Sequence, residues 1–506
     1  MAATFATFYE KDNEMLFEKR LTRNILCTLF ILFFILPYLF LITEFRLNTD
    51  IDWEEWLWVA RNTLTQSFLS ATAGTLIGFL VALGSLSFST AKRSRYFEAL
   101  CLLPFYIPTL FFVLALLQVW PQFPKGLWGV VIVNTLMNFG LATLMIREGL
   151  QQKAGPSTDL AIVLGSSKFQ YFFRVLIPLL RFDLLTTFSF LFITAFLSFS
   201  VPLLVGGQQV SSFEIMIYET LRHQQDWSSA VFISLIQSLF LGVIFFFSLR
   251  PSQNEKSMRF HQFSWLNLKY FWLVATLPII ILVFGYLISF FQSHFLLHLE
   301  ELFKRPLAEH MINTLLLAIV TSTISFGLNA LASLLYFSTR FSFFIRFYLG
   351  PTSALVGFGV LIWGNRFHLP EFIQLSLAYL FVFQIFFLRN ILIPRLAELQ
   401  KQYELSQVLG VSELDFFKKV VFASLARHLF QSSGLFAVWV MGDFAIANMI
   451  SKQYITLAQV IERLCNNYRL DQALILSTFL GVLIFAVYHV IQKAGHVIDQ
   501  RTHQKL

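Results

Sequence analysis

Long apolar segments, each about the length of a membrane-spanning helix, recur along the whole chain and are separated by short polar segments. A helix needs about 20 apolar residues to cross roughly 30 Å of hydrocarbon, and lipid forces every backbone polar group to be satisfied internally. The pattern predicts an all-α polytopic membrane protein with about twelve spans. Their expected ranges are 24–43, 63–88, 99–119, 127–146, 184–205, 229–249, 270–291, 312–337, 347–363, 372–388, 428–447 and 472–492.

The composition agrees with a membrane protein, because 57% of the 506 residues are hydrophobic and only 13% are charged, which excludes a set of soluble domains. With twelve spans, both termini share one side of the membrane. The segments on that side hold 27 of the 37 Lys and Arg residues. This asymmetry predicts that both termini are cytoplasmic. It also puts the excess positive charge, a net +8, on the cytoplasmic face, so no nucleic-acid partner is expected.

The chain contains an internal repeat. Six spans, a polar linker and six more spans divide it into expected halves 1–252 and 266–506, with 253–265 as the cytoplasmic linker. The triplet Asn-Thr-Leu precedes the second span of each half, at residues 62–64 and 313–315. Because six is even, both halves enter the membrane in the same orientation. The repeat therefore predicts a pseudo-twofold axis along the membrane normal, with any translocation path between the halves.

The most distinctive repeated stretch is polar and interrupted by glycine. It runs from Asp159 to Pro178 and again from Glu404 to Ala423, with Gly165 and Gly410 separated by 245 residues. One such loop would be an ordinary capped turn, but two copies at equal places favour a docking surface for another protein. We expect these surfaces within 156–178 and 401–423.

Local residue chemistry predicts that each copy forms a helix, a glycine turn and a second helix. Pro156 is suited to begin the first helix, with Ser157 at its cap and Asp159 in its first turn. Gly165 is suited to end it in the left-handed conformation. Ser167 with Gln170 is typical of a capping box on the second helix, and the second copy repeats this arrangement approximately with Ser412 and Asp415.

Motifs for enzymatic chemistry are absent from the sequence. There is no GxxxxGK[ST] phosphate loop, no HExxH and no other metal-ligand spacing. The three cysteines, Cys27, Cys101 and Cys465, form no disulfide framework. We therefore expect no catalytic residue, no metal site and no ATP hydrolysis by this chain, and a membrane enzyme is disfavoured.

The two polar loops resemble the EAA signature of ABC importer permeases, in which an acid-Ala-Ala triplet is followed by a glycine and later by Leu-Pro. The matching positions are Asp159, Leu160, Ala161, Gly165, Val175, Ile177 and Pro178 in the first copy, and Glu404, Leu405, Ser406, Gly410, Val420, Phe422 and Ala423 in the second. The first copy departs from the signature at Asp159 and Leu160, and the second has lost the proline.

The resemblance implies that the helix ending at each glycine is a coupling helix seated in an ATP-hydrolysing subunit. It implies two copies of that ATPase, which would bind ATP and Mg, while this chain holds no cofactor. It also implies a periplasmic solute-binding protein and a place in the bacterial inner membrane. The expected coupling residues are Asp159, Ala161, Gly165, Ser167, Glu404, Gly410 and Ser412.

Two further stretches, Ser198–Ala230 and Met441–Ala473, resemble the two halves of fused thiamine ABC transporter permeases. Transport of thiamine or its phosphate esters is the implied function. Fused ferric-iron permeases have similar segments and are the alternative. A secondary transporter driven by an ion gradient also fits a twelve-span repeat, but it would carry several intramembrane charges.

Asp443 is the one acid expected well inside a span. Such residues usually face a bundle interior or a watery path, and a carboxylate suits a cationic substrate. Ser198 occupies the collinear position in the first half. Aromatic residues suited to stacking on a cation lie nearby in sequence, so the expected substrate path comprises Ser198, Phe199, Trp439, Asp443 and Phe444. In the alternative interpretation, Asp443 only bonds a neighbouring helix or supports a gate.

Overall fold

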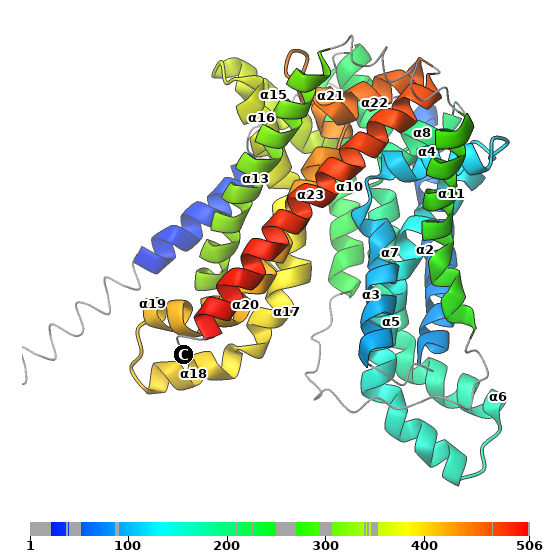
Figure 1. Ribbon diagram of the computed structural model, residues 1–506, viewed down its shortest axis with the longest axis vertical. Coiled ribbons are helices and arrows are strands. Elements are labelled where there is room, and N and C mark those ends of the chain that lie inside the picture. The colour runs from blue at the N-terminus through cyan, green and yellow to red at the C-terminus, as the bar shows by residue number, and fades with distance from the viewer. Residues whose placement is uncertain are drawn as a thin grey trace, which may run out of the picture.

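The structure is a computed structural model that describes most of the chain. The described residues are 22–36, 39, 52–86, 91–207, 210–224, 226–248, 270–292, 306–337, 341, 344–345, 353–467 and 469–503. Within these ranges the regular elements are all helical, which confirms the all-α prediction (Figure 1). The expected linker 253–265 lies outside the described residues.

In the first sequence half, the long helices α2 and α5 pack against each other and against α7. In chain order the elements are the N-terminal helix Thr22–Leu36, α2 (Trp53–Ser85), α3 (Ala91–Tyr106), α4 (Thr109–Val119), α5 (Leu127–Val163), α6 (Lys168–Tyr171), the π-helical turn η1 (Phe172–Leu176), α7 (Ile177–Phe196), α8 (Ser200–Val205), α9 (Phe213–Glu219), η3 (Thr220–Gln224) and α10 (Trp227–Ser248).

The second half follows a similar order around α20 and α23. Its elements are η4 (Phe271–Thr276), α11 (Leu277–Gln292), α13 (Leu307–Leu335), α15 (Ser353–Arg366), α16 (Glu371–Phe387), η5 (Leu388–Leu392), α17 (Ile393–Glu398), α18 (Gln400–Val408), α19 (Glu413–Phe416), η6 (Phe417–Val421), α20 (Phe422–Gly442), α21 (Ala445–Ile450), α22 (Leu457–Asn466) and α23 (Leu470–His503).

Helices lie within all twelve expected span ranges, but several spans are not continuous. Six described helices are long and apolar enough to cross a membrane. The expected span 99–119 is bent by 89° between Tyr96–Pro104 and Thr109–Val119, because Pro104 and Pro108 interrupt the helical hydrogen bonds. The expected spans 184–205 and 428–447 each end early and continue as the short helices α8 and α21.

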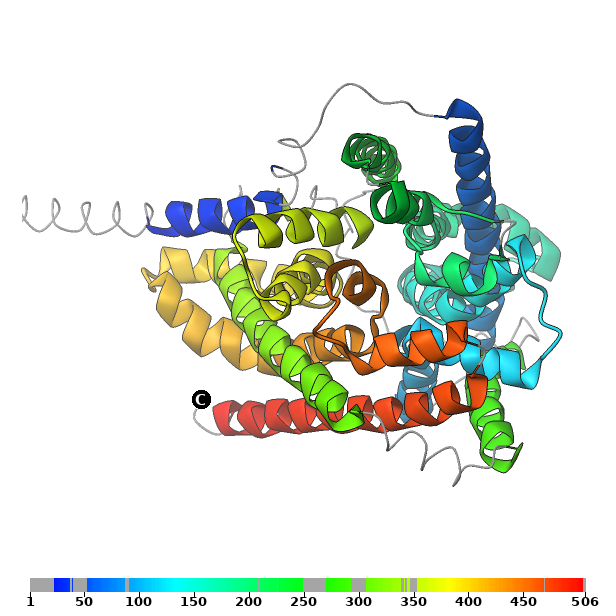
Figure 2. The ribbon, with the colours of Figure 1, turned by 90° about the horizontal axis from the view of Figure 1, so that it is seen from above.

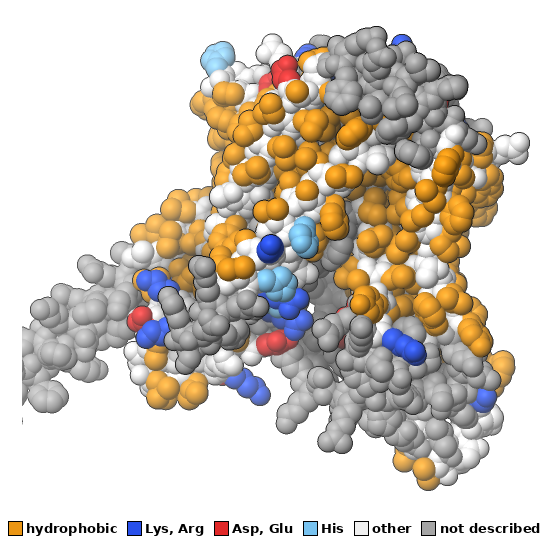
Figure 3. All heavy atoms as spheres, in the orientation of Figure 1, with side chains coloured by type: hydrophobic (Ala, Val, Ile, Leu, Met, Phe, Trp, Pro, Cys, Tyr) orange, Lys and Arg blue, Asp and Glu red, His pale blue; other side chains and the backbone are white. Residues whose placement is uncertain are grey.

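Apolar side chains cover most of the described surface in the middle of the face shown in Figure 3, while several Lys, Arg and His side chains gather in its lower part.

Inside the second half, a series of hydrogen bonds between polar side chains links α13, α16 and α20. Gln384 donates to Asn329 Oδ1 at 2.8 Å, and Asn329 donates to the Ser432 hydroxyl at 3.1 Å. Such buried amide and hydroxyl contacts join helices in lipid, where apolar contact has no hydrophobic driving force.

The two sequence halves exchange their first helices. The N-terminal helix packs on the second half, where Phe30 lies 5.0 Å from Phe341 and Phe33 lies 4.8 Å from Phe381 between ring centroids. Helix α11, the first of the second half, packs instead against α4 of the first half (Figures 1 and 2). The sequence halves therefore interlock rather than pack as separate bundles.

The repeated Asn-Thr-Leu triplet has the same structural role in both halves. Thr63 Oγ1 accepts a hydrogen bond from the Phe213 amide at 3.1 Å, and Thr314 Oγ1 accepts one from the Leu457 amide at 2.9 Å. Phe213 and Leu457 are the first residues of α9 and α22, so these amides have no partner within their own helices. The triplet thus fixes a short helix of each half onto a long one.

Candidate functional site

The first repeated loop forms the predicted elbow at the end of α5. Gly165 has φ +65°, and the Ser166 amide donates to the Ala161 carbonyl at 3.0 Å, which closes the last turn of the helix. Ser167 then begins α6 with a complete capping box, since Ser167 accepts from the Gln170 amide and the Gln170 side chain accepts from the Ser167 amide. The predicted glycine turn and cap are both confirmed.

The second loop has the same backbone course between α18 and α19. Gly410 has φ +69°, and the Val411 amide donates to the Ser406 carbonyl at 3.0 Å. Ser412 accepts from the Asp415 amide at 3.1 Å, but the Asp415 carboxylate accepts from the Ser412 hydroxyl rather than from a backbone amide. This cap is half of a capping box, because the aspartate is one methylene shorter than the usual glutamate or glutamine.

One local prediction for the first elbow is wrong. No separate helix begins at Pro156; α5 runs without interruption from Leu127 to Val163. Proline has a helical φ and costs one backbone hydrogen bond, so a long helix with strong flanking turns accommodates it. Ser157 is consequently not a cap, and its hydroxyl lies 3.5 Å from that of Tyr171. The side chain of Asp159 is not among those described, while Glu404 is exposed and accepts from Gln400 at 3.0 Å.

Each elbow exposes a cluster of large apolar side chains. Val163 is 82% exposed and Val408 is 84% exposed. The clusters are Leu160, Val163, Leu164 and Phe169 on the first elbow and Leu405, Val408, Leu409 and Leu414 on the second. Both elbows protrude at the same end of the molecule (Figure 1). Contiguous apolar patches among polar residues are typical of interaction surfaces, and each elbow presents one such patch.

A cavity of about 450 Å³ lies between the two halves, away from the elbows. Helices α4, α5, α7, α8 and α10 of the first half and α15, α16, α20 and α21 of the second contribute to its wall. All five residues expected on the substrate path line it: Ser198, Phe199, Trp439, Asp443 and Phe444.

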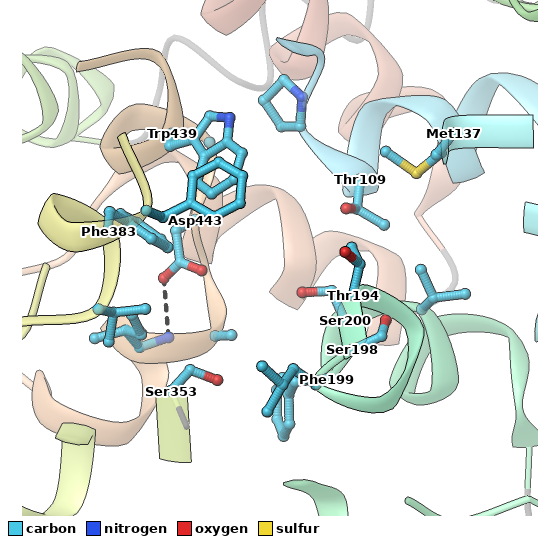
Figure 4. A pocket seen from close by; sticks show the side chains of 18 of the residues that line it. Thr109, Met137, Thr194, Ser198, Phe199, Ser200, Ser353, Phe383, Trp439 and Asp443 are labelled. Atoms are coloured by element: carbon cyan, nitrogen blue, oxygen red, sulfur yellow. Dashed lines mark hydrogen bonds between the residues drawn. The ribbon is translucent and has the colours of Figure 1, made fainter. Parts of the chain in front are cut away.

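Asp443 lies at the break between α20 and α21. Its backbone is extended, with φ −83° and ψ 126°, and its Oδ2 accepts from the Ile446 amide at 2.9 Å and from the Tyr379 hydroxyl at 3.2 Å. The side chain therefore caps α21. In Figure 4 the carboxylate also faces Thr194, Ser198 and Ser200 across the cavity, so Asp443 combines a structural bond with a position on the cavity wall.

Aromatic rings form the wall beside Asp443. Trp439 stacks on Phe386, with centroids 5.0 Å apart and planes at 29°, and meets Phe383 edge to face at 5.2 Å. Phe199 stands on the opposite side, beside Ser198 (Figure 4). Sequence reasoning missed Phe383 and Phe386. Their spacing of three residues places both on one face of α16, but the sequence contains 61 phenylalanines, and this spacing alone does not single them out.

The cavity offers one carboxylate and several hydroxyl and amide groups, including Asn134 and Asn138. No group of three or more His, Cys, Asp and Glu residues suited to a metal ion occurs in the part of the chain that the structure describes. Arg389 also lines the wall, whereas Arg147, its counterpart in the repeat, is buried and paired with Glu98 at 3.0 Å. The lining therefore combines aromatic rings and neutral polar groups with one carboxylate and one guanidinium.

Comparison with known proteins defines the class of this membrane protein. Residues 74–295 match the family model of the binding-protein-dependent transport system inner membrane component. The chain is similar to this family of ABC importer permeases, whose members are transport subunits rather than enzymes. Permeases of this kind work with ATPase and binding-protein partners, and ATP is bound by the ATPases.

The individual relatives are mainly thiamine permeases. The chain is 23% identical over 500 residues to the thiamine transport system permease protein ThiP of Haemophilus influenzae, covering 89% of this chain and 92% of the relative. It is 26% identical over 210 residues to ThiP of Escherichia coli, covering 37% and 39%. A putative ferric transport system permease protein of H. influenzae, FbpB 1, is 31% identical over 122 residues, covering 24% and 19%. No solved structure matches the chain significantly.

Proposed function

We propose that this chain carries thiamine, or one of its phosphate esters, from a periplasmic solute-binding protein into the cytoplasm through the cavity between its halves. The observation that carries the proposal is the single carboxylate of Asp443 beside the aromatic wall of Trp439, Phe383 and Phe386. The similarity to one thiamine permease over 89% of the chain supports the same substrate.

The cavity chemistry suits an aromatic cation. Its volume is within the range of small-molecule sites, about 300–1,000 Å³. A thiazolium ring over the face of a tryptophan gains about 0.5–2 kcal/mol from cation–π attraction, and a pyrimidine ring stacks on the same kind of wall. Asp443 would balance the charge, while the hydroxyls of Thr194, Ser198 and Ser200 would receive polar substituents. Moderate attraction suits a transport path, because the substrate must also leave.

The alternative substrate, ferric iron, is less well matched. Iron sites combine several carboxylate, imidazole or thiolate ligands, and the described cavity wall supplies Asp443 as its one carboxylate, with no histidine or cysteine. The similarity to ferric permeases also covers only 24% of the chain.

The elbows are the proposed contacts with two ATPase copies, one under each half (1–252 and 266–506, joined by the linker 253–265). ATP binding would draw the elbows together and turn the cavity outward, and hydrolysis would reset it. The proposed coupling residues are Asp159, Ala161, Gly165, Ser167, Glu404, Gly410 and Ser412. This arrangement puts the elbows and both chain termini in the cytoplasm of a bacterial cell, with the protein in the inner membrane. The matched apolar clusters at one end of the molecule support it.

The test is uptake into liposomes that contain the permease, its ATPase and its binding protein, with thiamine, thiamine phosphates and ferric iron compared. We expect ATP-dependent uptake of thiamine compounds, reduced about tenfold or more by Asp443→Asn, since a lost bond to a charged group costs about 1.5–3 kcal/mol. Asparagine caps helices as well as aspartate does, so this change removes charge and keeps the fold. Asp471→Asn, at an exposed position, is the control. Uptake of iron alone would refute the substrate, and full activity of Asp443→Asn would refute the cation site.

A further inference from the structure

The two elbows are held in place by different contacts. In the repeat register of 245 residues, Thr158 and Tyr171 of the first elbow correspond to Tyr403 and Phe416 of the second. The hydroxyls of Tyr171 and Thr158 lie 2.5 Å apart, so the first elbow is closed by a bond between its own two helices. The second elbow cannot form this bond, because phenylalanine replaces the tyrosine and has no hydroxyl.

The second elbow is held instead by an aromatic cluster. The Tyr403 ring stacks on Phe337 of the α13 end, with centroids 4.2 Å apart and planes at 11°. Phe416 packs on Tyr403 at 5.5 Å and on Phe337 at 5.8 Å. This packing leaves the Tyr403 hydroxyl free to point toward Glu413, to which it donates a hydrogen bond at 3.2 Å.

Glu413 also forms an ion pair with Arg23 of the N-terminal helix. Arg23 Nη1 lies 3.5 Å from the Tyr403 hydroxyl, so the three side chains form one cluster. The Arg23 and Glu413 side chains are only 24% and 36% exposed, which shields the pair from the screening that weakens exposed ion pairs. Burial and the Glu413 carboxylate raise the pKa of Tyr403, against the opposing effect of Arg23, so its hydroxyl stays protonated and able to donate.

The sequence register shows that this cluster belongs to one elbow only. The residue that corresponds to Glu413 in the first elbow is Lys168, whose charge is opposite and which could not pair with an arginine. The N-terminal helix is itself fixed on the second half by Phe30 and Phe33. Arg23 thus connects a firmly packed helix to a protruding elbow.

We propose that Arg23 is a positioning residue that sets the second elbow for its ATPase by holding Glu413 and Tyr403. The inference rests on the proposed role of the elbows as ATPase contacts. It makes the two ATPase contacts unequal: the first elbow is positioned by its own residues, and the second by a helix from the start of the chain. Loss of the cluster should lower the amount of substrate carried per ATP hydrolysed without changing the apparent substrate affinity.

The experiment compares Arg23→Gln, Glu413→Gln, Arg23→Glu and the exchanged pair Arg23→Glu with Glu413→Arg, in liposomes with ATPase and binding protein. Exposed and partly exposed pairs contribute up to about 1 kcal/mol, so each single variant should lower substrate carried per ATP about two- to fivefold. The exchanged pair should recover most of this loss, because it restores opposite charges. Arg395→Gln, which breaks the exposed Arg395–Glu398 pair of α17 outside both elbows, is the matched control and should behave as the unmodified chain.

Three results would overturn the proposal: single variants that couple normally, an exchanged pair no better than the single variants, or an equal loss in Arg395→Gln. Each variant is also tested for copurification with the ATPase and for thermal stability in detergent, so that a folding defect is recognised. If the unmodified chain shows no ATP-driven uptake and no ATPase contact, it is the proposed function that fails rather than the role of Arg23.

Discussion

The glycines of the two elbows allow a quantitative test of docking. Gly410 has φ +69° and Gly165 has φ +65°, a region that costs other L-residues roughly 1–2 kcal/mol. A Cβ added at either position would meet nothing within 4 Å. The cost of a side chain is therefore conformational and not steric, and it can be varied by the choice of residue.

Gly410→Val should weaken ATPase binding, because a β-branched residue opposes the left-handed conformation that shapes the elbow. A cost of 1–2 kcal/mol corresponds to roughly a five- to thirtyfold change in an equilibrium constant. Gly410→Asn should bind within about threefold of the unmodified chain, since asparagine adopts this conformation more readily. Affinity of the permease in nanodiscs for its isolated ATPase, measured by microscale thermophoresis, gives both numbers.

Gly207 provides the matched control. It has φ +60°, and an added Cβ would also meet nothing within 4 Å, but it follows α8 and belongs to neither elbow. Gly207→Val should carry the same conformational cost and leave ATPase affinity unchanged. The reasoning is refuted if Gly410→Val binds as tightly as Gly410→Asn, or if Gly207→Val weakens binding equally.

Two further predictions concern stability. Thr314→Ala should lower the free energy of unfolding by about 1–3 kcal/mol, because it leaves the buried Leu457 amide without its partner. Thr314→Ser should keep this hydrogen bond. Thermal unfolding in detergent distinguishes the two variants. The second prediction concerns Glu371, whose carboxylate accepts hydrogen bonds from four donors: the Ser451 hydroxyl and the amides of residues 452–454. Burial alone would raise the pKa of Glu371, but these donors outweigh burial and lower the pKa. Glu371→Gln should therefore reduce thermal stability at pH 7. The difference should begin to shrink as the pH falls below about 4.3, the ordinary glutamate pKa, and should vanish only below the lowered pKa of the native carboxylate. A difference that persists unchanged at low pH would contradict this.

The elbows were predictable because their geometry is set by neighbouring residues. Gly165, Ser167 and Gln170 specify a turn and a cap through backbone conformation and short-range hydrogen bonds, and the second copy repeats the pattern. The prediction failed at Pro156, where local preference favoured a new helix but the continuous α5 prevailed.

The cavity was predictable in part. The rarity of an acid within a span pointed to Asp443, and the repeat pointed to Ser198, so the five expected residues do line one cavity. The contribution of Phe383 and Phe386 depends on which face of α16 turns inward, and in lipid both faces of a helix are apolar, so periodicity carries little information.

The exchange of first helices was not predictable from the sequence. Hydrophobic patterns identify each helix but do not specify which apolar neighbour it meets. The partners of the N-terminal helix, Phe341 and Phe381, follow it by more than 300 residues.

That long separation constrains how the protein is made. Phe381 is synthesised 348 residues after Phe33, which at about 5–20 residues per second takes roughly 20–70 s. During this time the N-terminal helix is in the membrane without its final neighbours, and the first half cannot complete its native packing before the second is inserted. The newly synthesised protein therefore passes through an incompletely packed intermediate in the bilayer. At this stage chaperones and membrane proteases have access to it.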